Sequence, residues 1–179
     1  MLIIDNHKLE SLRKHLNCPD LQVYAYAEWG SKNPDHRQLI HAHRDRIVLN
    51  SATPLHSSIA HTQGMGILVI SPHPVGVDIE STSRITEPAV KRVARPGEYE
   101  QAPSAASLWT AKEACFKALR TFKQPSVLSG FSVGSWQKIA SQFETFSLLE
   151  YSEHHAPSGG AGICFHEQNF SFGFFCVNL

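Results

Sequence analysis

The stretch "WTAKEACFKALRTF", residues 109–122, has the spacing of a helix but carries charge where such a helix should be apolar. At about 100° per residue, one apolar arc forms along it, made of Leu108, Cys115, Leu119 and Phe122 and widened by Trp109 and Phe116. Lys112 falls in the middle of this arc, and Glu113 and Lys117 lie just beyond its aromatic edge. These three side chains therefore require either a polar cleft beside the helix or a path to water.

The segments before this helix predict strands and helices in alternation. Residues 21–30 alternate like a strand, and Asn33 followed by Pro34 predicts an N-cap and the first residue of a helix. Residues 64–71 and 75–80 predict two strands of a hairpin, joined by the tight turn "SPHP". The N-terminal residues 1–16 predict a short amphipathic helix.

Two segments are expected to be less regular. A polar loop is predicted over residues 50–58, and residues 85–100 predict short helical pieces that prolines interrupt. Ser104 is then expected to cap the helix that carries the opening stretch, and this helix should end near Lys123.

After residue 123 the sequence consists of short segments rich in aromatic and β-branched residues, and this composition predicts strands. The four expected strands cover residues 130–136, 143–151, 161–167 and 170–177. Helices and strands in this order predict an α+β fold. Because both parts of the chain contain a helix followed by strands, we expect pseudo-halves at about 1–101 and 102–179. The sequence has no long linker, so we expect a single domain, 1–179.

Composition narrows the class of protein. The chain has 179 residues, 42% of them hydrophobic, and its net charge is zero, which argues against a protein that mainly coats nucleic acid. The four cysteines show no paired spacing, so reduced thiols and a cytoplasmic location are expected. The start of the chain does not resemble a signal peptide, and no apolar run approaches the roughly 20 residues that span a bilayer. The eleven histidines are scattered and form no ligand motif.

The strand "VGVDIE", residues 75–80, places two carboxylates on one face. Val75, Val77 and Ile79 should point into a core, whereas Gly76, Asp78 and Glu80 point the other way. At about 3.3 Å per residue, Asp78 and Glu80 lie roughly 6.6 Å apart along the strand, close enough to share one cation such as Mg²⁺. Gly76 would leave room for a ligand beside them. The alternative is a strand whose polar face is simply in water.

Glu113 would supply a third oxygen ligand if the helix packs beside this strand. Its alternative is a surface pair with Lys117, four residues later. The alternative for Lys112 is a stem that crosses the edge of the core while its amine reaches water. Taken together, these residues predict three carboxylates for a metal and two lysines for phosphate.

The two motifs together resemble the paired signature of 4′-phosphopantetheinyl transferases, of the surfactin-synthetase type and the holo-acyl-carrier-protein synthase type. Gly76-Val77-Asp78 matches the G-[IV]-D strand of that family, with Glu80 as the second acid, and "WTAKEACFK" matches the W/F-[STC]-x-K-E-[SA]-x-x-K helix at every defined position. Upstream, His61 and Thr62 fit a weaker family segment in which Ala60 replaces the usual serine. The similarity covers about residues 57–122.

The resemblance implies a fold with two α+β parts related by pseudo-twofold symmetry. Each part would have a small antiparallel sheet and a long helix, and the active site would lie between them. It also implies transfer of the 4′-phosphopantetheine arm of coenzyme A (CoA) to a serine of an acyl or peptidyl carrier protein, with adenosine 3′,5′-bisphosphate as the other product. The chain is shorter than the monomeric members and longer than the trimeric ones, and we expect a monomer that binds neither nucleic acid nor membrane.

The resemblance also implies roles for individual residues. Asp78, Glu80 and Glu113 would bind Mg²⁺, and Asp78, Glu113 and Lys117 would be catalytic. Glu113, directly or through a metal-bound water, would take the serine proton, and Lys117 would stabilise the departing bisphosphate. His61, Thr62, Lys112 and Lys117 would bind CoA. For Lys112 the alternatives are contact with phosphate or pantetheine, or a role in holding the cleft closed. By chemistry alone, Arg37, Arg44 and Arg46 are further candidates for CoA contacts.

Three other functions compete with this interpretation. A Mg²⁺-dependent phosphohydrolase or nuclease could use the same acids, a non-catalytic module could bind CoA or carrier proteins, and a histidine-rich protein could buffer metal. Because carrier proteins are acidic, a basic or apolar lip should receive them. The candidates for this lip are Arg84, Ile85, Lys91, Arg92, Arg95, Phe122 and Lys123.

Overall fold

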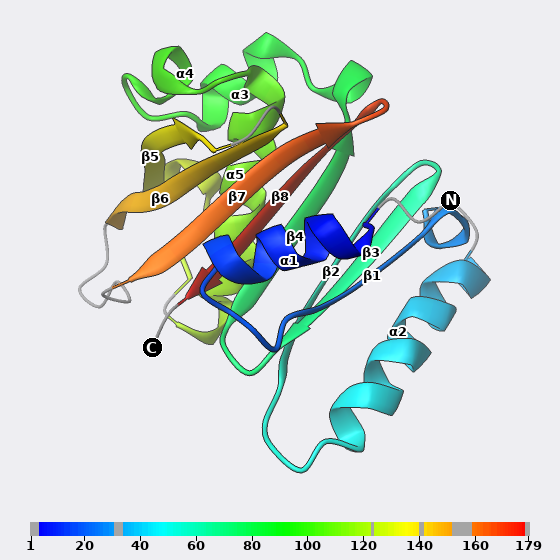
Figure 1. The fold of residues 1–179 in the computed structure, drawn as a ribbon. Helices are drawn as coiled ribbons and strands as arrows, with labels where there is room; N and C mark the ends of the chain where they lie inside the picture. The colour runs from blue at the N-terminus through cyan, green and yellow to red at the C-terminus, as the bar shows by residue number, and fades with distance from the viewer. Residues whose placement is uncertain (1–3, 31–33, 123, 140–141, 152–158, 178–179) are drawn as a thin grey trace.

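The computed structural model describes residues 4–30, 34–122, 124–139, 142–151 and 159–177, and it shows an α+β fold with two antiparallel sheets (Figure 1). Its main elements in chain order are α1 (Asn6–His15), β1 (Gln22–Tyr26), α2 (Pro34–Leu49), β2 (His56–Thr62), β3 (Met65–Ser71), β4 (Val75–Ser81), α3 (Glu87–Val93), α4 (Glu98–Gln101), α5 (Ala105–Ala118), β5 (Phe131–Lys138), β6 (Phe143–Tyr151), β7 (Gly160–Glu167) and β8 (Phe170–Val177). Four short 3-10 turns join them: η1 (Ala27–Trp29), η2 (Thr82–Arg84), η3 (Leu119–Thr121) and η4 (Leu128–Gly130).

The first sheet has the strand order β1-β3-β2, and α2 packs on one of its faces. A small core of Trp29, Ile40, Leu68 and Ile70 joins the helix to the sheet. β2 and β3 form a hairpin with Thr62 opposite Met65, and Gly64 takes the positive φ of 86° that this two-residue turn needs. The predicted Asn33 cap of α2 lies outside the described residues.

The expected hairpin of residues 64–71 and 75–80 is wrong, although both strands exist. β3 is already paired on both sides by β1 and β2, so it offers no edge to β4. The strand that forms a hairpin with β3 is β2. Its first residues, 56–58, had been predicted as the end of a polar loop. β4 instead pairs with β8, which lies in the last ten residues of the chain.

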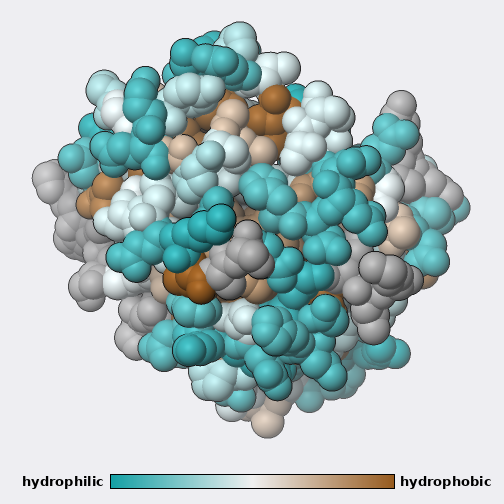
Figure 2. Space-filling model, turned by 45° about the horizontal axis from the view of Figure 1, so that its top comes forward, coloured by the Kyte–Doolittle hydropathy of each residue, from teal (hydrophilic) through white to brown (hydrophobic). Residues whose placement is uncertain are grey.

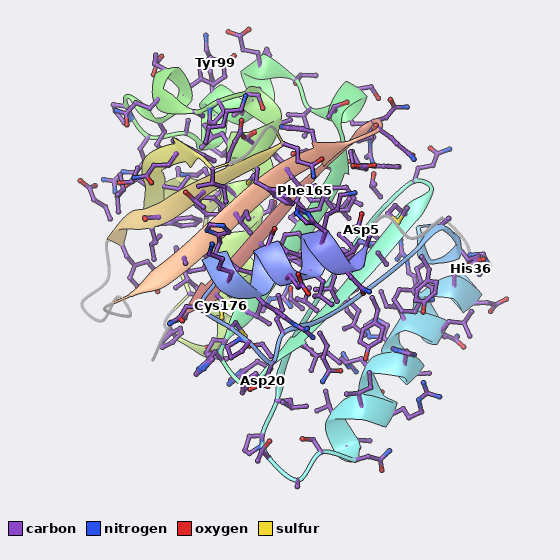
Figure 3. The ribbon with its side chains drawn as sticks, in the orientation of Figure 1. Asp5, Asp20, His36, Tyr99, Phe165 and Cys176 are labelled. Carbon is purple, nitrogen blue, oxygen red and sulfur yellow. The ribbon has the colours of Figure 1, made fainter. Side chains whose placement is uncertain are left out.

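The second sheet has the order β4-β8-β7-β6-β5 and is covered on both faces. α5 packs on one face, chiefly against β4 and β8, while α1 crosses the other face (Figure 1). The core under α1 contains Leu12 and Leu16 together with several phenylalanines, including Phe165, which Figure 3 labels. The sheets divide the chain between β3 and β4, whereas the predicted pseudo-halves meet near residue 101, so those halves stay a prediction.

The helix predicted from residues 109–122 is α5, and it begins where Ser104 was predicted to cap it. Ser104 caps it by accepting a hydrogen bond from the Ser107 N–H. Regular α-helix ends at Ala118, earlier than predicted, and η3 continues the coil to Thr121. Lys123 lies outside the described residues. None of the helices in the described part of the chain is long and apolar enough to cross a membrane.

β4 presents the two faces that its sequence alternation predicts, but neither face is in water. Val77 and Ile79 belong to the core under α1, whereas the face with Gly76 and Asp78 lies against α5. A Cβ atom added at Gly76 would lie 1.9 Å from the backbone oxygen of Ala114. Gly76 therefore makes room for the backbone of α5, and the expectation that it makes room for a ligand is wrong.

The edges of the two sheets meet at β2 and β4 without a backbone ladder between them. The Val77 N–H donates instead to the hydroxyl oxygen of Ser58, at 3.1 Å. Ser58 is itself buried, so this side chain satisfies a backbone group that would otherwise have no partner. The contact helps to hold β4, and hence Asp78, beside the first sheet.

Replacing Ser58 by alanine should lower the free energy of unfolding by about 1–3 kcal/mol, because the buried Val77 N–H loses its acceptor. Urea denaturation of both proteins measures this change. The control is Ser57→Ala, one residue earlier on the other face of β2, which should unfold at nearly the wild-type midpoint. An unchanged midpoint for Ser58→Ala would mean that the two sheets do not depend on this contact.

Candidate active site

An ion pair between Asp78 and Lys117 lies where α5 crosses β4. The Lys117 Nζ is 2.7 Å from Asp78 Oδ1 and also donates to the Val77 carbonyl oxygen at 3.0 Å. The two side chains are 11% and 14% exposed, so the pair is nearly enclosed. Burial raises the pKa of Asp78, and the positive charge of Lys117 opposes that effect. The helix and strand that the sequence paired by motif are thus in contact through these two residues.

Glu113 lies one helical turn before Lys117 and is only partly buried. Within the described residues, no hydrogen bond or ion pair holds its carboxylate. Burial raises the pKa of Glu113, and the nearby Asp78 charge raises it further, while Lys117 and Arg120 act in the opposite direction. A carboxylate with no committed partner and a raised pKa is suited to accept a proton.

Replacing Glu113 by glutamine should stabilise the protein at neutral pH. The folded protein holds the Glu113 proton more tightly than the unfolded chain does, so the stability linked to this group is lost as the pH rises through its raised pKa. Removing the charge should recover at most about 1 kcal/mol at pH 7, a small gain because Glu113 is only partly buried.

Urea unfolding of Glu113→Gln at several pH values measures this gain, which should shrink towards the ordinary glutamate pKa of 4.5. Glu28→Gln, at an exposed position in η1, is the matched control and should show no such trend. A Glu113→Gln protein that is less stable than wild type at pH 7 would contradict the assigned environment of Glu113.

Glu80 takes part in a network that joins the two sheets. Its Oε1 accepts hydrogen bonds from the Thr62 hydroxyl and from the Ser81 N–H, and Arg84 lies 3.3 Å away from the same oxygen. The hydroxyl of Thr62 is thereby engaged, and Thr62 is only 5% exposed. Thr62 therefore holds Glu80 in place, and its contact with CoA through the hydroxyl or the backbone N–H stays a prediction.

The three carboxylates expected to bind a metal are neighbours but do not converge. Among the residues that the structure describes, no three His, Cys, Asp or Glu side chains are grouped so that they could hold a metal ion. Asp78 is turned to Lys117, and one oxygen of Glu80 is turned to Thr62 and Arg84. The chemistry of Asp78 and Glu113 does fit a hard cation, since both are oxygen donors whose like charges oppose each other.

His61 lies on the exposed side of β2, among several cationic groups. Partial desolvation of the ring lowers the pKa of His61, and the charges of Arg37, Lys117 and His41 lower it further. Arg37 and His41 are one turn apart on α2, so this helix brings positive charge to the side of His61. Sequence reasoning had proposed Arg37 on chemistry alone and had missed His41, because the pairing of α2 with β2 is not visible in the sequence.

The other two arginines proposed for CoA have partners on α2 itself. Arg44 forms an ion pair with Asp45 at 2.6 Å, and Arg46 lies 3.4 Å from the Nδ1 of His43. Nothing in these contacts brings either arginine to His61, so Arg37 is the member of this set that the structure places near the candidate site.

Lys112 does not reach the candidate site or the solvent. Its side chain is fully buried, and its Nζ donates to both carboxylate oxygens of Glu98, at 2.9 and 2.8 Å, and to the Phe131 carbonyl oxygen at 2.7 Å. The expectations that Lys112 binds phosphate or carries its amine to water are therefore wrong. Glu98 was missed by sequence reasoning, although a lysine inside an apolar arc signals that a buried anion must lie nearby.

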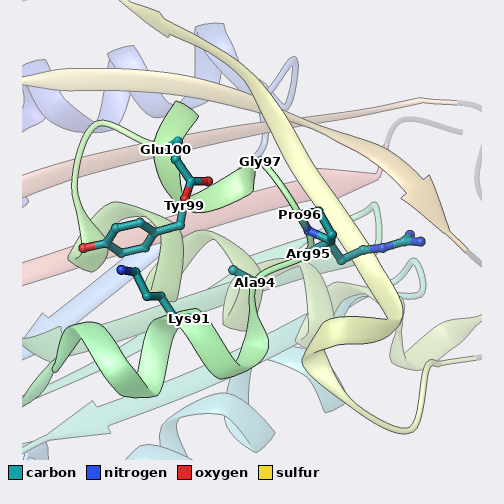
Figure 4. A pocket seen from close by; sticks show the side chains of 7 residues that line it. All are labelled: Lys91, Ala94, Arg95, Pro96, Gly97, Tyr99 and Glu100. Carbon is teal, nitrogen blue, oxygen red and sulfur yellow. The ribbon is translucent and has the colours of Figure 1, made fainter.

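Lys91, Arg92 and Arg95, three of the residues proposed to dock a carrier protein, lie on α3 or in the turn between α3 and α4, whereas Lys123 lies outside the described residues. Lys91, Arg95, Tyr99 and their neighbours line a shallow hollow of about 290 Å³ (Figure 4). Lys91 pairs with Glu87 and lies over the ring of Tyr99, while Arg95 pairs with Glu150. The face in Figure 2 is mostly hydrophilic, with only small separate hydrophobic patches. This surface is polar and mixed in charge.

Comparison with known families gives one match. The model of the 4′-phosphopantetheinyl transferase superfamily matches residues 74–167, slightly more than half of the 179-residue chain. The matched range contains Asp78, Glu80, Glu113 and Lys117, whereas His61 lies before it. No curated protein matches the chain.

Proposed function

Because the chain belongs to the 4′-phosphopantetheinyl transferase superfamily, we propose that it transfers the 4′-phosphopantetheine arm of CoA to a serine of an acyl or peptidyl carrier protein. In this reaction the serine oxygen forms a bond to the β-phosphorus of CoA. The bond from that phosphorus to the bridging pyrophosphate oxygen breaks, and adenosine 3′,5′-bisphosphate leaves. The observation that carries the proposal is the contact of Lys117 with Asp78 beside the uncommitted carboxylate of Glu113.

Glu113 would act as the general base. Its carboxylate has no hydrogen-bond partner in the described structure, and burial and the Asp78 charge raise its pKa. A raised pKa brings a carboxylate closer to the pH at which it can both be ionised and accept a proton efficiently. The serine proton would move to a Glu113 carboxylate oxygen as the new O–P bond forms.

Lys117 would neutralise charge on the pyrophosphate. It is a single cation, nearly enclosed between α5 and β4, and in a site with little water such a charge acts strongly on a developing anion. Its hydrogen bond to the Val77 carbonyl oxygen holds the ammonium group against β4. Lys117 would therefore bind the leaving group without a large movement of its backbone.

His61, Arg37 and His41 would hold the 3′-phosphate end of CoA. Their mutual repulsion already lowers the pKa of His61, and a bound phosphate would offset that repulsion. The proposal for His61 rests on this clustering of positive charge on the exposed face of β2.

Mg²⁺ is the proposed metal, with Asp78 and Glu113 as protein ligands. Bound Mg²⁺ would supply a Lewis acid for the pyrophosphate oxygens, and one or two carboxylates with substrate phosphates are its usual ligands. Glu80 as a third ligand stays a prediction, because one of its oxygens is engaged with Thr62. Asp78 would hold its place through Lys117 and its strand before any ligand arrives.

The carrier protein, the monomeric state and the cytoplasmic location are further proposals. Lys91, Arg92 and Arg95 would attract an acidic carrier to the surface near α3, since complementary charge mainly speeds encounter and orients the partner. All four cysteines are free and buried, which supports a compartment that keeps thiols reduced. The expectation of a monomer rests on both sheets being supplied by one chain.

Intact-mass spectrometry of an apo carrier protein tests the function. The carrier is incubated with this protein, CoA and Mg²⁺, and a parallel sample contains EDTA. A mass gain of one phosphopantetheine group that EDTA prevents is the expected result. CoA hydrolysis without carrier would favour a phosphohydrolase, and a complex with no mass change would favour a binding module.

A further inference from the structure

The Lys112–Glu98 pair is a complete hydrogen-bonding unit within the core. An ammonium has three protons, and Lys112 gives them to Glu98 Oε1, Glu98 Oε2 and the Phe131 carbonyl oxygen. Its Nζ also lies 4.8 Å from the centre of the Phe131 ring. Because every donor is used and the side chain is 0% exposed, Lys112 has nothing left to offer a substrate.

Glu98 is equally committed. Besides Lys112, its Oε1 accepts the Val133 N–H at 2.6 Å, and its Oε2 accepts the Arg95 N–H. The pair therefore ties α5 to α4, to the turn before α4 and to two residues of β5. No other described ion pair combines full burial of one partner with 4% exposure of the other.

The face of α5 that packs on the second sheet is nearly flat. It is formed largely by small side chains, namely Ala111, Ala114, Cys115 and Ala118. At Gly76 and Gly173 the sheet lets the helix backbone approach directly. Dispersion contacts between such smooth surfaces are not directional and do not by themselves fix the rotation of the helix about its axis. Hydrogen bonds of Ser107 to Glu144 and of Thr110 to Ser171 orient the first turns of α5, and the Lys112–Glu98 pair is the buried directional contact next to Glu113.

Rotation of α5 matters because Glu113 and Lys117 project from the side of the helix. At 100° per residue, these two positions lie about 40° apart around the axis, while Lys112 lies 100° from Glu113. A turn of about 20° would move a side-chain tip at a radius of about 5–6 Å by roughly 2 Å. A misplacement of about 1 Å in an active site can cost about 100-fold in rate.

We propose that the Lys112–Glu98 pair is a positioning device that fixes the rotation of α5 and thereby sets Glu113 and Lys117 against Asp78. Lys112 and Glu98 are positioning residues in this role, since neither touches the reacting groups. The kinetic part of the inference rests on the proposed transferase function, whereas the geometric part does not.

A double variant tests whether the Lys112–Glu98 pair positions α5 or only stabilises the fold. Lys112→Met leaves Glu98 buried and without its cation, and should lower the melting temperature by about 10 °C. Adding Glu98→Gln removes the second buried charge but places its amide nitrogen opposite the N–H of Val133 or Arg95, so it should recover only part of the lost melting temperature. The double variant is therefore folded but has lost the directional pair.

We expect the double variant to lose about 100-fold in kcat while its KM values for CoA and carrier change less than about threefold. Its crystal structure should show the Lys117–Asp78 distance, 2.7 Å in wild type, lengthened beyond contact. A double variant with wild-type kcat and an unchanged distance would overturn the proposal. If wild type transfers no phosphopantetheine, the proposed function fails, and the distance alone decides the inference.

A conservative variant covers the case in which the double variant does not fold. Glu98→Asp keeps the charge but shortens the side chain by one methylene, so the pair must draw α5 to a new position. We expect lowered kcat with a folded protein, and full kcat would contradict the proposal. The matched control is Lys8→Met with Glu167→Gln, which removes a partly buried ion pair of 3.1 Å between α1 and β7 and should leave kcat unchanged.

Discussion

Replacing Asp78 by asparagine is expected to lower the rate of phosphopantetheine transfer at least about 100-fold while the protein stays folded. Asparagine has the shape of aspartate but lacks the charge that attracts Lys117 and the proposed Mg²⁺. The loss follows from electrostatics in an enclosed site, where one preorganised charged group contributes far more than it would in water.

Stability should change much less than the rate. The substitution weakens an ion pair, but it also removes a carboxylate whose charge is disfavoured by burial. Lys117 keeps the Val77 carbonyl oxygen as an acceptor and is 14% exposed, so its ammonium is not left without partners. We expect the free energy of unfolding to fall by no more than about 2 kcal/mol.

Single-turnover mass spectrometry with saturating CoA and Mg²⁺ measures the rate, and thermal unfolding measures the stability. Asp20→Asn, at an exposed position far from α5 in the chain, is the control and should retain full activity. Asp78→Asn with more than about a tenth of the wild-type rate would remove Asp78 from the proposed machinery.

A companion variant, Glu80→Gln, decides whether the metal set has two or three protein carboxylates. A loss as large as that of Asp78→Asn would make Glu80 a ligand. A smaller loss would assign Glu80 to the network that joins Thr62 and Arg84 across the two sheets.

Local patterns in the sequence predicted the elements that carry the site. The alternation of residues 75–80 sorted Val77 from Asp78 correctly, and Ser104 marked the start of α5. The fold class and the family were confirmed, because both depend on short segments whose spacing can be read along the chain. The site roles of Asp78, Glu113 and Lys117 stay predictions, although the structure brings these residues together.

The sequence could not predict which segments, far apart in the chain, contact one another in the fold. Alternation marks β4 as a strand but does not say that β8 is its partner, so a local hairpin was expected in error. The same holds for Lys112, whose position in an apolar arc is compatible with a polar cleft, a path to water or a buried anion. Only the path of the chain from α3 to α4 brings Glu98 beneath α5 and decides between them.

Replacing Gly76 by alanine should destabilise the protein by at least about 3 kcal/mol. The added Cβ would lie 1.9 Å from the Ala114 backbone oxygen and 2.6 Å from the Ala118 backbone nitrogen. Neither atom belongs to a rotatable side chain, so the clash can be relieved only if α5 moves away from β4.

The movement of α5 should also abolish transfer, because Lys117 and Glu113 would leave Asp78. Urea unfolding and the mass assay measure the two losses on the same samples. The control is Gly64→Ala, where the nearest atom to the added Cβ is a ring carbon of Phe170 at 4.0 Å. It should cost only about 1–2 kcal/mol for a side chain at positive φ, and it should leave transfer intact.

A comparison with Gly160 distinguishes a backbone clash from a side-chain clash. An added Cβ at Gly160 would lie 2.3 Å from the Phe175 ring, and a smaller side chain in Phe175→Leu should partly rescue Gly160→Ala. Gly76→Ala should have no such rescue, because trimming Ala114 to glycine leaves its carbonyl oxygen in place. If Ala114→Gly did restore stability to Gly76→Ala, then α5 would not rest on β4 through its backbone, and the close approach of α5 to β4 would need another explanation.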